Sequence, residues 1–196
     1  MTSTDWRDLA ITSVRDPAQA ARHLMAMALP RETLWTGLLL VAVLNTLLFS
    51  LSRLITPLAT PFPALLNSPI IYFLMVILGL LLTVYAIFWV GRGLGGKGRL
   101  DEVMVLIVWM QALRVVVQAA TLVLLVTIPE LAAILVLAAG VIGIYMLVHF
   151  INQAHRLNSL GRAIGVLIAS VAAIVLGLSL ILSLIGAPFA GVSGYV

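Results

Sequence analysis

The sequence contains no cysteine, and it is poor in charge: aspartate, glutamate, lysine and arginine together make up 9% of its 196 residues. Without cysteine, the chain can form neither disulfides nor thiolate metal sites. Soluble domains carry charge at about a quarter of their positions. A chain that is 63% hydrophobic and so sparsely charged cannot cover its surface with polar groups. Part of that surface must therefore face lipid.

Acidic residues are also missing from the long apolar runs, none of which contains aspartate or glutamate. The runs are continuous and lack the alternation of barrel strands, and a backbone in lipid must satisfy its own hydrogen bonds. The sequence therefore predicts an all-α, polytopic membrane protein, a bundle of five transmembrane helices in a domain of residues 33–187. We place the spans at about 33–52, 69–90, 103–127, 131–152 and 163–187.

A polar tail, residues 1–32, precedes the first span. Within it, Asp16 followed by Pro17 predicts the start of a short helix, because aspartate caps helices and proline suits the first helical position. Earlier in the tail, Trp6 and Val14 lie near one helical face, which indicates a short amphipathic helix at the membrane surface. The same residues also fit a partly disordered tail, and the sequence does not decide between the two.

Lysine and arginine are distributed unevenly between the two sides of the predicted membrane. Nine of the 11 fall in the tail, in the loop after the second span or in the loop after the fourth span, whereas Arg53 stands alone on the other side. Loops rich in lysine and arginine stay in the cytoplasm. We therefore expect a cytoplasmic N-terminus and an external C-terminal tail of residues 188–196.

Residues 91–102 read GRGLGGKGRLDE and match parts of two nucleotide-binding patterns, G-x-G-x-x-G and G-x-x-x-x-G-K. Both patterns need a strand before the glycines, and the second also needs serine or threonine after the lysine. Here a predicted membrane helix precedes the glycines, and Gly98 follows Lys97. We therefore expect no nucleotide and no other cofactor. We interpret this glycine segment as a turn that basic residues hold at the anionic membrane surface.

Several stretches of the chain resemble a known family. GGKGRLDEV, which follows two spans, resembles the membrane domain of the Yip family, the Ypt-interacting proteins. DPAQAARHLM, WMQALRVVVQ and FINQAHRLNSLGRAIGVL resemble the bacterial branch of that family. The resemblance implies five spans with a cytoplasmic N-terminus and, for eukaryotic members, small GTPase partners in vesicle traffic. It leads us to expect a multi-pass protein of the bacterial inner membrane.

Arg114 lies near the middle of the third predicted span. Gln111, Arg114, Gln118 and Thr121 are spaced three, four and three residues apart, so they share one helix face, which we call the Arg114 stripe. An arginine at the bilayer centre costs about 2.5–3.5 kcal/mol on the insertion scale, so its guanidinium needs partners. We interpret Arg114 as a buried clamp between helices. The alternative is an anion site, a lipid-headgroup site or a water-filled path.

Two further groups of residues are candidates for binding or packing. The basic residues near the second and third cytoplasmic segments form a predicted basic face: Arg92, Lys97, Arg99, His155, Arg156 and Arg162. We expect His155, with Arg156, to lie among lipid headgroups. Small residues recur every four positions in the fifth span and would let helices approach closely: Gly165, Ala169, Ala173 and Gly177. We favour packing of this small-residue stripe inside the bundle over dimerisation, and the oligomeric state stays open.

No feature of the sequence indicates catalysis, since it shows no nucleophile–base pair, no metal-ligand set and no carboxylate within a span. We therefore expect a non-enzymatic scaffolding or membrane-organising protein that acts through its basic face. Its expected partners are the anionic headgroups of the bilayer and other proteins at the cytoplasmic surface, and not nucleic acid. The alternative is a small channel or transporter component that uses the Arg114, Gln111 and Gln118 face.

Overall fold

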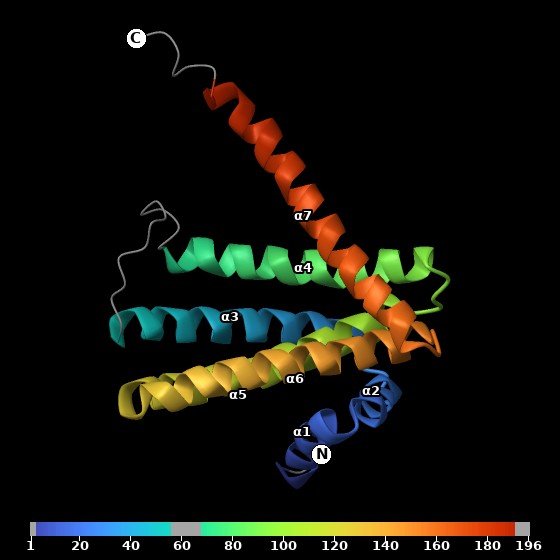
Figure 1. Cartoon of the computed structure of the whole chain (residues 1–196), viewed down its shortest axis with the longest axis horizontal. Coiled ribbons are helices and arrows are strands. Elements are labelled where there is room, and N and C mark those ends of the chain that lie inside the picture. Colours follow the sequence, from blue (N-terminus) through green and yellow to red (C-terminus); the bar gives the residue numbers. More distant parts are fainter. Residues whose placement is uncertain (1–2, 56–67, 191–196) are drawn as a thin grey trace.

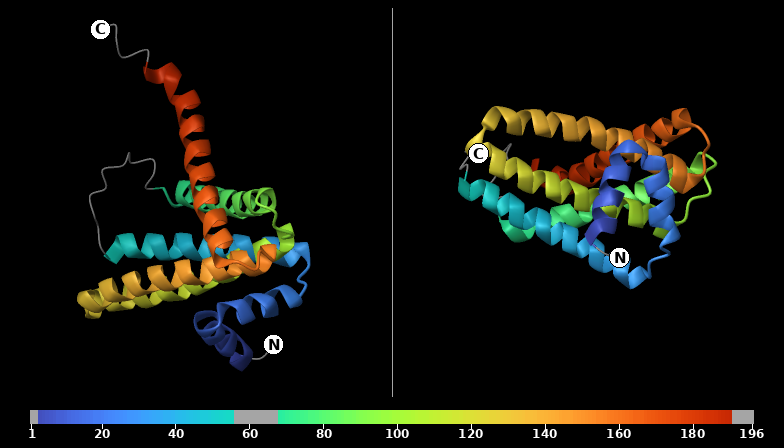
Figure 2. Two further views of the ribbon diagram at one scale, coloured as in Figure 1. Left: turned by 45° about the vertical axis from the view of Figure 1, so that its right-hand side comes forward. Right: turned by 90° about the horizontal axis from the view of Figure 1, so that it is seen from below.

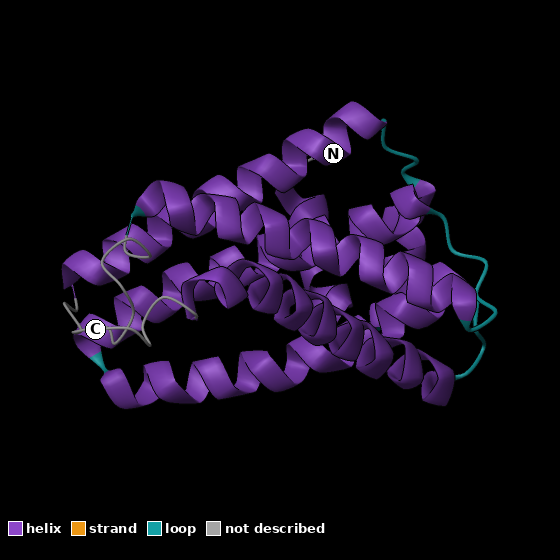
Figure 3. Cartoon of the chain, turned by 90° about the horizontal axis from the view of Figure 1, so that it is seen from above, coloured by secondary structure: helices purple, strands orange, loops and turns teal. Residues whose placement is uncertain are grey.

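The computed structural model describes residues 3–55 and 68–190, and these fold into seven helices (Figure 1). Short connections join the helices, and the described ranges contain no strand (Figure 3). The helices are α1 (Ser3–Arg15), α2 (Pro17–Ala26), α3 (Arg31–Ile55), α4 (Pro69–Gly93), α5 (Leu100–Thr127), α6 (Pro129–His155) and α7 (Leu160–Ala190).

Helices α3 to α7 are each long and apolar enough to cross a bilayer. The structure therefore confirms the predicted fold class, an all-helical multi-pass membrane protein with a short helical N-terminal part. The helices extend beyond the predicted apolar spans at most ends, because polar and capping residues continue a helix past the hydrocarbon core. Helix α7 runs to Ala190, and residues 191–196 of the predicted tail lie outside the described residues.

Helices α3, α4, α5 and α6 lie side by side, whereas α7 crosses α4 and then diverges from the other four (Figures 1 and 2). The connections 27–30, 94–99 and 156–159 all lie at one end of this bundle. We call it the loop end. The tight turn between α5 and α6 lies at the opposite end (Figure 1). The three connections predicted to share one side of the membrane therefore do lie together.

The hydrophobic core of the described chain is concentrated near the loop end. It is built from the first half of α3 and α5, the second half of α4 and α6, and the first turns of α7, with side chains that include Leu38, Val84, Leu106, Phe150 and Val166. Toward the opposite end the side chains are mostly exposed in the isolated chain, where lipid would cover them. The helices are thus tied together most firmly where the loops meet.

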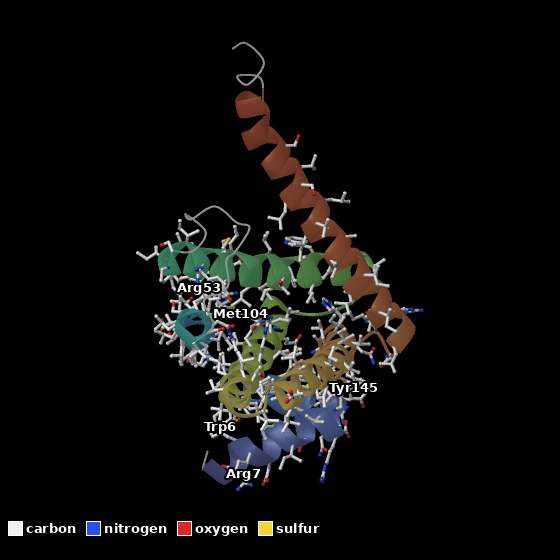
Figure 4. All side chains as sticks on the ribbon, turned by 60° about the vertical axis from the view of Figure 1, so that its left-hand side comes forward. Trp6, Arg7, Arg53, Met104 and Tyr145 are labelled. Atoms are coloured by element: carbon white, nitrogen blue, oxygen red, sulfur yellow. The ribbon has the colours of Figure 1, made fainter. Side chains whose placement is uncertain are left out.

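The N-terminal part forms two helices that lie across α5 and α6 (Figure 2, right). Asp16 caps α2 as predicted, because its side chain accepts a hydrogen bond from the Gln19 amide (2.9 Å) and Pro17 occupies the first turn. Helix α1 reaches α5 through Trp6, whose ring stacks on Trp109 with centroids 5.7 Å apart (Figure 4). The Trp109 indole also donates a hydrogen bond to the buried Ser13 hydroxyl (2.9 Å). Residues 3–26 therefore form two helices that pack against the bundle.

The small-residue stripe of α7 lies elsewhere than predicted. The side chains that α7 buries are those of Ala163, Val166 and Ser170. They lie on a neighbouring face of the helix and not on the face of the stripe. A β-carbon on Gly165 or on Gly177 would meet nothing within 4 Å, and Ala173 is exposed, although Ala169 is half-buried. Because α7 diverges from the bundle, none of residues 171–180 is buried. The expectation that Gly165, Ala173 and Gly177 pack inside the bundle is therefore wrong.

Candidate functional site: a clasp at the loop end of the bundle

The glycine segment ends α4 with a specific turn. The Gly96 amide donates to the Gly91 carbonyl (2.8 Å) and the Gly95 amide donates to the Arg92 carbonyl (3.0 Å). This pair of hydrogen bonds is the Schellman motif, which needs a left-handed residue just after the helix. Gly95 is that residue, with φ +87°. The turn satisfies carbonyls that α4 would otherwise leave unpaired and directs the chain toward α6.

Three other glycines of the segment surround one side chain, that of His155. A β-carbon on Gly91 would overlap the imidazole ring. One on Gly96 would lie 2.7 Å from the His155 β-carbon, and one on Gly98 would lie 2.6 Å from Nδ1. These glycines are therefore required by the close approach of α6 to the loop.

His155 itself is fully buried, at 0% exposure. Neither ring nitrogen has a hydrogen bond of good geometry to a described residue, although the Ile87 carbonyl lies close enough to interact with the ring. The expectation that His155 lies among lipid headgroups is wrong. Its ring instead fills the slot that the three glycines leave open, and so joins the end of α6 to the loop between α4 and α5.

Backbone and charged contacts close the same junction. The Lys97 amide donates to the His155 carbonyl (2.9 Å), and the Arg156 guanidinium donates to the Lys97 carbonyl (3.3 Å). Arg156 also makes two hydrogen bonds to the Glu102 carboxylate (2.5 and 3.0 Å), whose side chain is only 14% exposed. Glu102 in turn accepts from the Arg99 amide (2.9 Å) and caps α5. We call these contacts of Lys97, Glu102, His155 and Arg156 the loop clasp.

The loop clasp accounts for the resemblance of this segment to nucleotide-binding patterns. In those patterns, glycine-rich loops present free backbone N–H groups to phosphate. Here the amides of Gly95, Gly96 and Lys97 already donate to carbonyls of Arg92, Gly91 and His155. The glycines thus form the turn that ends α4 and make room for the buried His155 ring. The amides at these three positions are not free to bind a phosphate.

The family model of the Yip1 domain matches residues 11–181. The chain belongs to this family. The match confirms the family resemblance that the sequence motifs indicate, and it includes the whole loop clasp and the Arg114 stripe. No curated protein and no solved structure matches the chain.

In this Yip1-domain chain, two of the predicted basic-face residues are paired with acids. Arg99 forms an ion pair with Asp101 (2.7 Å), and Arg156 pairs with Glu102. Hydrogen bonding to these carboxylates raises the pKa of both arginines above the ordinary value, so both arginines stay charged at physiological pH. Each pair is close to neutral as a unit.

Apart from His155, the remaining predicted basic-face side chains are exposed, and none of them has an acidic partner among the described residues. Lys97 is among them, because it contributes only its backbone to the clasp. Arg92 lies over the Phe88 ring, 5.5 Å from its centroid, while Lys97 and Arg162 extend from the loop end. The unbalanced positive charge of the predicted face therefore belongs to Arg92, Lys97 and Arg162. We call these three the unpaired basic residues.

Only Arg114 of the Arg114 stripe lies on the outer surface of α5. Arg114 is exposed and makes no hydrogen bond or ion pair with any described residue, while Gln111, Gln118 and Thr121 are half-buried. The Thr121 hydroxyl donates to the Val117 carbonyl within its own helix (2.8 Å). The interpretation of Arg114 as a buried clamp is therefore wrong. The buried residues of α5 are 103–107 and Leu122, and Arg114 is not among them.

Sequence reasoning missed two contacts that matter here. Glu102 and Arg156 are 54 residues apart, and Ser13 and Trp109 are 96 residues apart. No local pattern pairs residues at such separations. The one available signal was the number of glycines in a short turn. One glycine is enough to end a helix, and Gly91, Gly96 and Gly98 are additional to it.

Proposed function

We propose that this Yip1-domain chain is a non-enzymatic, membrane-organising protein of the bacterial inner membrane that acts through the unpaired basic residues of its loop end. The observation that carries the proposal is the loop clasp. It fixes the α4–α5 loop to the end of α6, and with it the positions of Arg92 and Lys97. Glu102 and Arg156, the ion pair within the clasp, bind each other, which fits a structural role better than a catalytic one.

The charge of the loop end supports anionic partners. A lysine or arginine near an anionic membrane surface contributes about 1 kcal/mol of attraction. Arg92 near the end of α4, Lys97 in the α4–α5 loop and Arg162 in the first turn of α7 are exposed, and no acidic residue neutralises them among the described residues. The clasp holds Arg92 and Lys97 in place, and the loop end therefore presents positive charge suited to lipid headgroups or to acidic patches of other proteins.

The proposal requires the loop end to face the cytoplasm, which the distribution of lysine and arginine favours. A reporter that fluoresces only in the cytoplasm is expected to be bright when it follows a chain truncated after Lys97. It should be dark when it follows Val196. The reverse pattern would place the loop end outside and would exclude this function.

Neutralising the unpaired basic residues is expected to weaken association at the loop end. The variant Arg92→Gln/Lys97→Gln/Arg162→Gln, held in phosphatidylcholine nanodiscs, should bind vesicles containing phosphatidylglycerol at least tenfold more weakly than the original chain. The difference should shrink in high salt, because exposed charges are screened within about 10 Å at 0.1 M salt.

The matched control is Arg99→Gln/Asp101→Asn, which removes an ion pair at the same end and leaves the net charge unchanged. It should bind like the original chain. Topology is checked in both variants with the reporter fusions, because loop charges also set orientation. Equal binding by the triple variant and the control, with orientation retained, would refute a role for the basic surface.

The alternative, a channel or transporter component, finds less support. A conducting path needs its polar groups to line an interior. In the Arg114 stripe, Arg114 is instead exposed on the outer side of α5. A path along this stripe would need another chain to enclose it.

A further inference from the structure

A cavity of about 160 Å³ opens among α3, α4 and α5 close to the loop end. Its inner wall is aliphatic, with the buried side chains of Leu34, Val84 and Met104. Figure 4 shows Met104 in the space among these three helices. Trp35 and Tyr85 also line the cavity and are each 41% exposed, so it opens on the outer surface of the bundle. In a membrane, that surface faces lipid.

The lining changes in character with depth along the bundle. Arg31 and Asp101 lie at the loop-end margin, since each is within the first two residues of its helix. Trp35 follows one turn farther along α3. Tyr85 and Leu81 precede the end of α4 by eight and 12 residues, which at 1.5 Å per residue is about 12 and 18 Å. The two charged residues therefore lie only at the loop-end margin, and the lining deeper in the bundle is aromatic and aliphatic, as expected from a bilayer surface toward its core.

The charges at the mouth of the cavity are not balanced. Arg31 makes no hydrogen bond or ion pair with any described residue, and the same holds for the indole of Trp35 and the hydroxyl of Tyr85. Asp101, by contrast, is already bound by two hydrogen bonds from Arg99 (2.7 and 3.1 Å). A free guanidinium at the mouth of a cavity whose lining contains two further free donors favours an anionic group with several acceptor oxygens.

We propose that this cavity binds one anionic phospholipid, with its phosphate at Arg31 and part of one acyl chain against Leu34, Val84 and Met104. Sites that enclose a drug-sized ligand usually measure about 300–1,000 Å³. A cavity of about 160 Å³ can therefore enclose only a segment of its ligand. A phospholipid meets this condition because the rest of the molecule remains in the bilayer. The site uses none of the unpaired basic residues, so it is independent of the function proposed above.

The experiment measures binding of dioleoylphosphatidylglycerol and dioleoylphosphatidylcholine to the purified full chain by native mass spectrometry, at low lipid-to-protein ratios. A single phosphatidylglycerol adduct is expected, at least fivefold tighter than the phosphatidylcholine adduct. Arg31→Gln should weaken the phosphatidylglycerol adduct about fivefold and remove the preference, which corresponds to about 1 kcal/mol for one surface charge.

Two further variants decide between a site and general attraction. Arg22→Gln removes the same charge from the exposed side of α2, away from the cavity and from the unpaired basic residues, and it should leave the phosphatidylglycerol preference unchanged. Leu81→Trp fills the deep end of the cavity and should weaken both lipid adducts. Equal losses in Arg31→Gln and Arg22→Gln, or no preference for phosphatidylglycerol in the original chain, would overturn the proposal. So would full binding by a folded Leu81→Trp chain.

Discussion

Replacing Gly91 with alanine is expected to lower the free energy of unfolding by about 3 kcal/mol, near the upper end of what overpacking costs. The new methyl group would overlap the His155 ring. The ring cannot move aside easily, because it is fully buried and its backbone carbonyl is held by the Lys97 amide. Thermal unfolding of the purified chain in detergent should show a midpoint lowered by roughly 6–12 °C.

Gly93 provides the matched control, since it lies two residues farther along the same helix and a β-carbon there would meet nothing within 4 Å. Gly93→Ala should be neutral or stabilise the chain by about 0.5–1 kcal/mol, because alanine favours the helix. In a His155→Ala background, Gly91→Ala should cost well under 1 kcal/mol, since the ring it meets is gone. An equal cost in both backgrounds would mean that Gly91 is required for another reason.

The fold class could be predicted because it depends on composition along the chain. Five continuous apolar runs separated by proline, glycine or charge allow little besides five membrane helices. The structure places those helices where the runs lie, from Arg31–Ile55 to Leu160–Ala190. The Asp16 cap was equally accessible, because it is a local interaction between residues three apart.

The loop clasp could be predicted only in part. The sequence indicates that residues 91–102 turn the chain back, and the turn geometry at Gly95 agrees. It does not indicate that His155 fills the turn, because the contact joins residues about 60 positions apart and depends on how α6 packs. A histidine beside an arginine at a helix end ordinarily suggests the membrane surface. Here three missing β-carbons create a buried slot that fits the ring.

The orientation of individual helix faces could not be predicted either. Regular spacing identifies residues that share a face, as in the small-residue stripe of α7, but not which neighbour that face meets. In α7 the face that meets α4 and α6 contains Val166 and Ser170, and in α5 Arg114 faces outward. In α7 the outcome depends on the crossing of α7 over α4, and in α5 on its packing against α3 and α6, and both are properties of the whole bundle (Figure 1).

Replacing Arg114 with leucine is expected to favour membrane insertion of α5 by about 3–4 kcal/mol. Arginine at the centre of a span costs about 2.5–3.5 kcal/mol on the insertion scale, whereas leucine contributes about 0.3–0.6 kcal/mol in favour. The measurement is the inserted fraction of residues 100–127 in a translocon assay. The segment is first made less hydrophobic, so that half of the molecules insert. Arg114→Lys is the control, since it keeps the charge and should insert like the original segment.

The same substitution in the full chain tests whether Arg114 has a partner. Because Arg114 makes no hydrogen bond or ion pair with the described residues, Arg114→Leu removes a desolvation cost and breaks no contact that they provide. The thermal midpoint of the folded chain should therefore stay the same or rise, in detergent and in liposomes alike. A midpoint that falls for Arg114→Leu but not for Arg114→Lys would contradict this expectation. It would mean that the charge is satisfied in the membrane by a group beyond the described residues, and it would strengthen the case for an assembled path along the Arg114 stripe.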